Sequence, residues 1–416
     1  MTAAPPGWRG IWGARRIRLW LGAAILAAWL PLLGVGLRGW LDFSAFYAAG
    51  ALAFTPGLAS LETVVRFQAA HGLPITPWVY PAGLALLYVP FSWLPYGLAA
   101  PLHVVLEVGA LVAAAWIGGP LFGITRRCAL LGVFAWAPAA AGVVSGQNTA
   151  LALLLVVLVA WALRRGRPWL GGLAVGLLAY KPQLAAPHAG LLAWRGAWAA
   201  LPVLAALVGA HYLLGVLATG GAWGWPGDWL TTLGAYARED LVANGWQAVS
   251  LPTLGARLDL VARPDLVPRP DLAPGPPSMT LASLPWLMLA GYVIGGVIVL
   301  AALPALRAWP AERAVALAAA VGLVVSPHAF VYDATLLLPA IALFAAASSA
   351  RGWPWPDRWL LAGGYGLALL WPLGGVVGFV PLVVVVAAAP GVLLGWGPLR
   401  RFGVAARPGE LPPTTA

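Results

Sequence analysis

Apolar runs of about 20 residues recur along most of the chain, separated by short turns that carry arginine. A helix of that length crosses the hydrocarbon core of a bilayer, so the pattern predicts an all-α integral membrane protein. Arginine turns such as Arg126-Arg127 and Arg164-Arg165 mark the cytoplasmic side. Threading the runs between these markers predicts a polytopic bundle of about twelve transmembrane helices. Both chain ends are then inside, and residues 398–416 form a cytoplasmic tail.

Residues 80–118 do not fit this simple alternation. The stretch is long enough for two crossings, but the flanking arginine markers permit only an odd number. Pro81, Pro90 and Pro95 interrupt its helical pattern. We therefore expect a short broken or re-entrant element around Pro81–Pro95.

The remaining pattern predicts a single membrane domain over residues 1–416, without a separate soluble domain. The first span, about 19–38, follows a basic N-terminus and is expected to be an uncleaved anchor, followed by an outer loop over 39–79. A larger outer loop covers 218–280. Its Pro-rich insert at 262–278 contains a tandem hexapeptide, which we expect to be an extended spacer. This loop also carries acidic residues, namely Asp228, Glu239 and Asp240.

The composition supports a membrane protein and explains the excess of basic over acidic residues. The chain is 61% hydrophobic and 9% charged, with a mean hydropathy of +0.86. Its 24 basic residues exceed the 13 acidic ones, but much of that charge lies in turns, so we expect no nucleic-acid partner. The single cysteine, Cys128, cannot form an intramolecular disulfide. Abundant alanine, glycine and arginine with almost no lysine suggest a bacterial genome, and therefore the bacterial inner membrane.

Lys181 is the only lysine, and it lies in one of the most apolar stretches, directly before Pro182. A cation at bilayer depth costs about 3 kcal/mol, so it is retained where a partner or an anionic ligand compensates it. Pro182 ends the helix, which places the ammonium at a helix terminus facing polar space. Taken alone, Lys181 is equally consistent with a side chain extending to the interface and with one that holds a phosphate.

Polar residues gather at span ends on the face opposite the arginine markers, and we expect them to form one site there. The segments are Asp42–Tyr47, Tyr80-Pro81, Ser145–Asn148, Tyr180–Gln183 and Ser326–Asp333.

Structural explanations compete with this interpretation. Asp42 is also consistent with an ordinary interfacial carboxylate, and Gln147 and Asn148 with residues that satisfy a sharp turn. His328, after Ser-Pro, is also consistent with a helix N-terminal residue without a ligand. Asp333 lies one turn into an apolar helix, where a carboxylate needs a partner.

Several familiar catalytic motifs are absent from the sequence. It has no Walker motif, no paired cysteines, no His-Glu-x-x-His, no Gly-x-Ser-x-Gly in a plausible setting and no Asp-x-Asp. A dedicated nucleotide-sugar site is therefore unsupported. Chemistry at the outer face needs an activated donor that a lipid carries.

The order of the polar segments resembles glycosyltransferase family 87, membrane transferases of the GT-C fold that use polyprenyl-phosphate sugars. The matching elements are Asp42–Tyr47, Tyr80-Pro81-x-Gly83, Gly146-Gln147-Asn148, Gly171–Gly176 leading into Lys181-Pro182-Gln183, and Ser326-Pro327-His328 with Tyr332-Asp333. The resemblance covers roughly residues 40–390. It departs at Ala82, where family members commonly have a second proline, and at the 262–278 insert.

The resemblance implies a GT-C-type helical bundle with broken or re-entrant elements and outer loops, and it implies roles for the gathered residues. Asp42 would be the general base that takes the proton of an acceptor hydroxyl. Lys181, His328, Gln147 and Asn148 would bind the donor phosphate, stabilising the leaving polyprenyl phosphate. The substrate-binding residues would be Tyr47, Tyr80, Gln183, Tyr332 and Asp333.

The resemblance further implies a periplasmic reaction without a metal or another cofactor. The donor would be a polyprenyl-phosphate hexose, with mannose the family-level expectation and arabinose left open. The acceptor would be a glycolipid or glycan, and a single displacement would invert the anomeric configuration. Two other classes compete, a transporter or flippase for lipid-linked sugars and an envelope polymer ligase. Transporters usually place their sites near the bilayer midplane between repeats. A ligase would use arginine and histidine in its large outer loop, but loop 218–280 contains no histidine.

Overall fold

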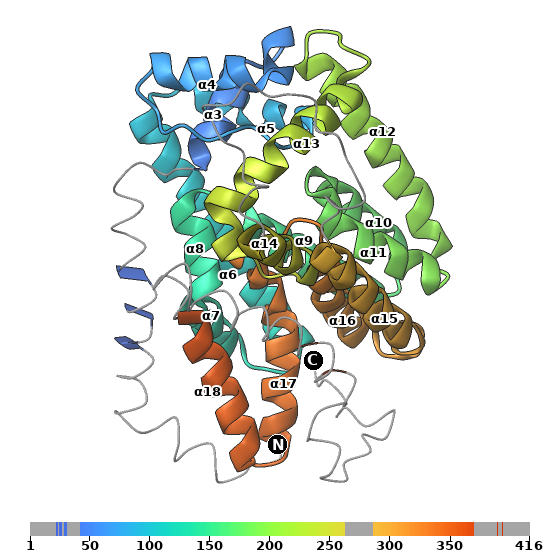
Figure 1. Cartoon of the computed structure of the whole chain (residues 1–416). Coiled ribbons are helices and arrows are strands. Elements are labelled where there is room, and N and C mark those ends of the chain that lie inside the picture. The colour runs from blue at the N-terminus through green and yellow to red at the C-terminus, as the bar shows by residue number, and fades with distance from the viewer. Residues whose placement is uncertain are drawn as a thin grey trace.

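The computed structural model describes residues 42–262 and 286–369, with a few more residues between 22 and 30 and at 389 and 393. The regular elements in these ranges are helices, which confirms the all-α class (Figure 1). The predicted first span, the Pro-rich insert and the cytoplasmic tail lie largely or wholly outside the described residues.

The predicted outer loop 39–79 folds into short helices that pack together at one end of the bundle (Figure 1). Phe43 and Phe46 are fully buried there, and their rings stack on His103 and Tyr88 respectively. This aromatic cluster holds the start of the first described helix in place. The elements of this loop are α3 (Phe43–Ala51), η1 (Pro56–Ala59) and α4 (Leu61–Ala70), and they are followed by η2 (Ala82–Leu84) and α5 (Ala85–Ser92).

The short broken element predicted around Pro81–Pro95 is present as η2 and α5. Pro90 lies inside α5, and Pro95 caps the next helix, α6 (Tyr96–Leu121). Proline lacks a backbone donor, which a helix start does not need, and Pro81 and Pro95 directly precede η2 and α6.

Arginine turns separate the helices of the central bundle, and glycines in the left-handed region close two of them. Gly166 follows Arg164-Arg165 with φ 66°, and Gly196 follows Arg195 with φ 68°. Glycine is favoured there because a side chain would clash with the backbone. The bundle continues with α7 (Arg126–Ala135), α8 (Ala137–Ser145), α9 (Thr149–Arg164), α10 (Pro168–Leu177), η3 (Leu178–Tyr180), α11 (Pro182–Trp194), η4 (Trp198–Ala200) and α12 (Leu201–Ala218).

The predicted outer loop 218–280 is largely helical where it is described. It forms α13 (Trp225–Asn244), η5 (Gly245–Gln247) and α14 (Leu251–Ala262). The chain then continues through α15 (Trp286–Ala308), α16 (Ala311–Val325), η8 (Val331–Leu337), α17 (Leu338–Ala350) and α18 (Trp355–Leu369).

Four helical segments of the described chain are long and apolar enough to cross a membrane, or up to five if α7 and α8, bent by 65°, form one span. The predicted count of about twelve is therefore not confirmed. A helix rises about 1.5 Å per residue. Helices such as α9, with 16 residues, and α11, with 13, are therefore too short to cross a bilayer core of roughly 30 Å. The long segments are Tyr96–Leu121, Trp198–Ala218, Trp286–Ala308 and Val331–Ala350.

Candidate active site

All five polar segments contribute to one cavity of about 1200 Å³. The predicted convergence is therefore confirmed. Of the predicted site residues, the cavity is lined by Asp42, Tyr80, Gln147, Lys181, Gln183, His328, Tyr332 and Asp333.

A tight backbone contact fixes Asp42 at the cavity. Asp42 precedes α3, and its amide donates to the carbonyl of Ser145 at 2.9 Å. The next residue, Gly146, has φ 79°, and a Cβ on it would lie 2.7 Å from the Cβ of Phe43. Only glycine fits this approach without a shift, so the 145–147 turn and the start of α3 are held side by side.

The side chain of Gln147 links the residues at the polar end of the cavity. Its Nε2 donates to Asp42 Oδ2 at 3.0 Å, and its Oε1 accepts from the Tyr80 hydroxyl at 2.7 Å. The Nζ of Lys181 lies 3.4 Å from the same Oε1. Two donors therefore face the amide oxygen and an acceptor faces the amide nitrogen, which defines the orientation of the amide.

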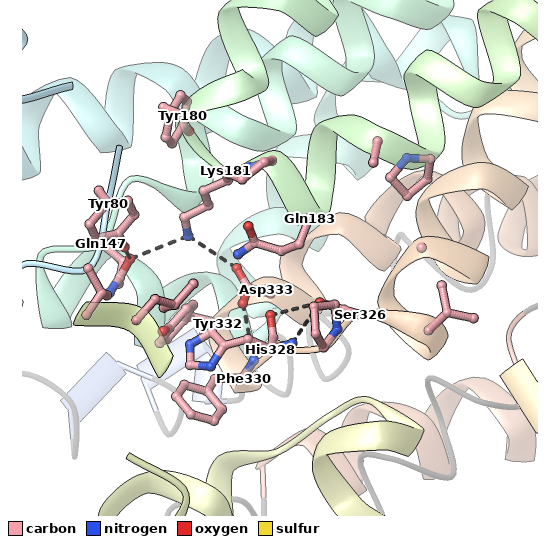
Figure 2. A pocket seen from close by; sticks show the side chains of 18 of the residues that line it. Tyr80, Gln147, Tyr180, Lys181, Gln183, Ser326, His328, Phe330, Tyr332 and Asp333 are labelled. Carbon is pink, nitrogen blue, oxygen red and sulfur yellow. Dashed lines mark hydrogen bonds and ion pairs between the residues drawn. The ribbon is translucent and has the colours of Figure 1, made fainter. Parts of the chain in front are cut away.

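Lys181 forms a buried ion pair with Asp333. Its Nζ lies 3.2 Å from Asp333 Oδ1, and the two side chains are only 3% and 2% exposed. The expectation that Asp333 has a partner is confirmed. The other oxygen of Asp333 accepts from the amide of Phe330 at 3.1 Å, and the Lys181 ammonium lies 5.2 Å from the ring centre of Tyr332. Figure 2 shows Lys181 extending from the end of η3 between Gln147 and Asp333.

Burial raises the pKa of Asp42 from 3.8 to about 6, because a carboxylate loses hydration there. The hydrogen bond from Gln147 and the positive charge of Lys181 act in the opposite direction. The charge of Asp240 adds to the increase. A carboxyl group with this pKa is ionised at neutral pH and is still a stronger base than an ordinary aspartate.

The second carboxylate at the cavity, Asp240, comes from α13 and is 4% exposed. Its Oδ1 accepts from the Tyr236 hydroxyl at 3.2 Å and from Asn244 Nδ2 at 2.7 Å. Its Oδ2 lies 3.5 Å from His328 Nδ1. The pair holds the imidazole of His328 against α13, while the His328 side chain stays partly exposed to the cavity.

An apolar groove continues from the polar end of the cavity along α11. Helix α11 faces the groove with one side, repeating every three or four residues: Gln183, Ala186, Pro187, Gly190, Leu191 and Trp194. The opposite walls come from α15 and α16, namely Val299, Leu303 and Leu306, and Ala318, Val321, Gly322 and Val325. A Cβ on Gly190 would meet no atom within 4 Å, so this position borders open space.

Two predicted site residues are not among those that line the cavity. Tyr47 packs beside Tyr96, and its hydroxyl donates to the carbonyl of Leu94 at 2.9 Å. Asn148 is 1% exposed at the start of α9, where its carbonyl accepts from the Tyr180 hydroxyl at 2.9 Å. Both residues therefore pack beside the cavity and do not line it.

His103 and Glu107, four residues apart on α6, both contact the segment that carries Gln147. The Nε2 of His103 lies 3.0 Å from the carbonyl oxygen of Gly146. Glu107 Oε2 accepts from the amide of Ala150 at 2.9 Å, at the first turn of α9. These two residues on α6 therefore support the turn beneath the polar network.

Sequence reasoning missed the part of the cavity wall that α13 provides. Trp229, Leu233, Tyr236, Asp240 and Asn244 line the cavity at helical spacing. That periodicity was present in the loop sequence and is the signal that could have indicated a buried helix face. Among the residues that the structure describes, no group of three or more His, Cys, Asp or Glu side chains could hold a metal ion.

Comparison of the sequence with known proteins identifies related glycosyltransferases and a family. The chain is 29% identical over 201 residues to an α-(1→3)-arabinofuranosyltransferase of Mycobacterium tuberculosis, covering 41% of this chain and 46% of that protein. It is also 29% identical over 133 residues to a polyprenol-phosphate-mannose-dependent α-(1→2)-phosphatidylinositol pentamannoside mannosyltransferase of the same species, covering 30% and 31%. The matches thus span less than half the length of these relatives.

No solved structure matches the chain. The model of glycosyltransferase family 87 matches residues 78–327, which is more than half of the 416 residues and includes most of the cavity-lining segments. The chain therefore belongs to glycosyltransferase family 87.

Proposed function

We propose that this protein transfers mannose, a hexose, from a polyprenyl-phosphate donor to a hydroxyl of a glycolipid or glycan acceptor. The reaction takes place at the outer face of a bacterial inner membrane, within a GT-C-type bundle. One observation carries the proposal. A single cavity combines a carboxylate and a buried lysine at its polar end with an apolar groove along α11.

The donor phosphate is assigned to the N-terminal end of α11. Lys181 directly precedes this helix, and its ammonium has three N–H groups, of which Gln147 and Asp333 occupy two. The helix N-terminus adds partial positive charge, since its first amides lack helical acceptors. Gln183 and His328 line the same end of the cavity and supply further donors. These groups offset the negative charge of Asp333, which alone would repel a phosphate.

The polyprenyl chain is assigned to the groove along α11. A helix of 13 residues extends about 20 Å at 1.5 Å per residue, and its groove-facing side is apolar beyond Gln183. Walls of valine, leucine and proline suit an isoprenoid, because they leave no polar group unsatisfied against it. Gly190 leaves room at the middle of this path.

Asp42 acts as the general base in this mechanism. It accepts the proton of the acceptor hydroxyl while the hydroxyl oxygen attacks the anomeric carbon. The bond from that carbon to the phosphate oxygen breaks, and the electron pair leaves with polyprenyl phosphate. Lys181 stabilises the charge that develops on this leaving group. A single displacement inverts the anomeric configuration. The hydrogen bond from Gln147 orients the carboxylate for this step.

The test is transfer in proteoliposomes that contain the full chain and a radiolabelled polyprenyl-phosphate sugar, with separate mannose and arabinofuranose arms. Asp42→Asn should lower transfer about 100-fold or more, because it removes the base. Asp228→Asn, the same substitution at an exposed position on α13, is the matched control and should stay near wild type. Near-normal transfer by Asp42→Asn would show that Asp42 is not the base, and transfer only from the arabinofuranose donor would overturn the choice of mannose.

The alternative classes make different products. A transferase releases polyprenyl monophosphate, a ligase releases polyprenyl diphosphate, and a transporter releases neither. Arg257 of the large outer loop is not among the residues that line the cavity, which disfavours the arginine-based ligase. Arg263 and Arg269 lie outside the described residues.

A further inference from the structure

The wall that α13 contributes has no role in the donor assignment. Its cavity-facing residues combine aromatic rings, from Trp229 and Tyr236, with hydrogen-bonding groups, from Asp240 and Asn244. The donor groove is built by α11, α15 and α16 instead. Two walls of different chemistry therefore serve one cavity.

Backbone and side-chain bonds hold α13 over the cavity from both ends. Near its start, Trp229 Nε1 donates to the carbonyl of Val79, directly before Tyr80. Beyond its end, the amide of Val249 donates to the carbonyl of Ala329 at 3.0 Å, directly after His328. The wall is thereby positioned against both segments that bring polar residues to the cavity.

Asp240 retains hydrogen-bonding capacity on this wall. An ionised carboxylate offers about four lone-pair sites. Among the side chains that the structure describes, its Oδ1 uses two, for Tyr236 and Asn244 on the same helix, whereas Oδ2 has one long contact, at 3.5 Å to His328. A buried carboxylate gains most from donors that complete this set, and sugar hydroxyls are neutral donors of the required kind.

We propose that the cavity-facing side of α13 binds the acceptor sugar, with Asp240 accepting hydrogen bonds from acceptor hydroxyls and Tyr236 packing against the sugar ring. The inference rests on the proposed glycosyl transfer and adds the side from which the acceptor approaches. An acceptor held on α13 lies between that helix and the donor along α11. Asp42 lines the same space, and it is close enough to Asp240 for the two charges to interact.

Asp240 and Tyr236 act on acceptor binding in distinguishable ways. Asp240→Asn keeps the shape of the side chain but removes its charge and one acceptor oxygen. Tyr236→Ala removes the ring and leaves every buried charge in place, so it tests the same surface even if Asp240→Asn does not fold.

The experiment measures equilibrium binding to the full-length protein in nanodiscs. The acceptor probes are two water-soluble disaccharides, methyl α-mannobioside and methyl α-arabinofuranobioside, and the donor-site probe is farnesyl phosphate. Wild type should bind at least one disaccharide. Asp240→Asn and Tyr236→Ala should each weaken that binding about tenfold, a difference of about 1.4 kcal/mol. The exposed Asp228→Asn should bind as wild type does, and all variants should retain farnesyl phosphate binding.

Two results overturn the acceptor assignment: wild type binds neither disaccharide, or both Asp240→Asn and Tyr236→Ala bind the disaccharide as wild type does. A loss of farnesyl phosphate binding in proportion to the loss of disaccharide binding also overturns it, since this indicates general damage to the cavity. Failure of the proposed function has a different signature. Wild type then binds no farnesyl phosphate and transfers no sugar, whatever the disaccharides do.

Discussion

Gln147 connects Asp42 to Lys181, with its Nε2 donating to Asp42 Oδ2 at 3.0 Å and its Oε1 3.4 Å from the Lys181 ammonium. The proposed base and the proposed phosphate-binding cation are thus coupled through one neutral amide. Because Lys181 is in turn paired with Asp333, a change at any of these positions reaches the others.

The pH dependence of the reaction should report the ionisation of Asp42. The pKa of Asp42 is raised to about 6, so the carboxylate form that accepts a proton is lost as the pH falls below that value. We expect kcat/KM to fall about tenfold per pH unit below pH 6 and to level off above pH 7. Initial rates across pH 4.5–8 at low acceptor concentration measure this limb, and a flat profile through pH 6 contradicts the assignment.

Replacing Gln147 should move that limb upward. Gln147→Met keeps the length of the side chain but removes the hydrogen bond that lowers the pKa of Asp42. The midpoint of the acid limb should therefore rise above 6, and kcat should fall because the carboxylate is less well oriented. Asp240→Asn should move the same midpoint downward, because it removes a negative charge that raises the pKa. Shifts in the same direction for both variants would contradict this account.

The contribution of Lys181 to stability, through its buried pair with Asp333, should be separable from its contribution to sugar transfer. Lys181→Met leaves an uncompensated buried carboxylate, and removing one partner of such a pair typically costs about 3–5 kcal/mol. The double variant Lys181→Met/Asp333→Asn should regain much of this stability, as measured by thermal unfolding in detergent. Its sugar transfer should nevertheless stay low, because the cation for the leaving phosphate is absent. Recovery of both stability and transfer would show that Lys181 serves only the fold.

A larger side chain at Gly190 should block the groove without damaging the fold. A Cβ there meets nothing within 4 Å, so Gly190→Leu extends into the proposed path of the polyprenyl chain. We expect the KM for the lipid donor to rise at least about tenfold, while thermal stability stays equal or increases by up to about 1 kcal/mol through helix propensity. Gly209→Leu, at an exposed and equally open position of α12, is the control. Unchanged donor KM in Gly190→Leu would place the chain elsewhere.

The polar site could be predicted from the sequence because a charged residue within an apolar segment indicates a partner or a ligand. Asp42, Lys181 and Asp333 are costly at membrane depth, and the arginine turns predicted that the three lie on one face. The structure confirms that they meet. Helix α13 was not predicted, although Trp229, Leu233, Tyr236 and Asp240 recur at helical spacing, because its charged residues and the Pro-rich insert that follows favoured a loop.

Local burial was also beyond sequence reasoning. Asn148 directly follows Gln147, yet it turns into the packing at the start of α9 while Gln147 faces the cavity. The turn at Gly146, which has φ 79°, is irregular, so sequence spacing does not reveal which of the next two side chains faces the cavity. The donor groove was missed for a different reason. In a chain that is 61% hydrophobic, apolar residues that line a groove do not differ from those that face lipid.

The continuity of the groove with the polar end of the cavity has a consequence for how the rate should be measured. On the proposed function, the donor reaches the reacting end by lateral diffusion, because its tail need not leave an apolar environment. The quantity that sets the occupancy of the enzyme is then the mole fraction of donor in the surrounding lipid, not its concentration in the aqueous volume. Diluting the proteoliposomes with buffer should leave the rate per enzyme unchanged, whereas diluting the donor with inert phospholipid should lower it.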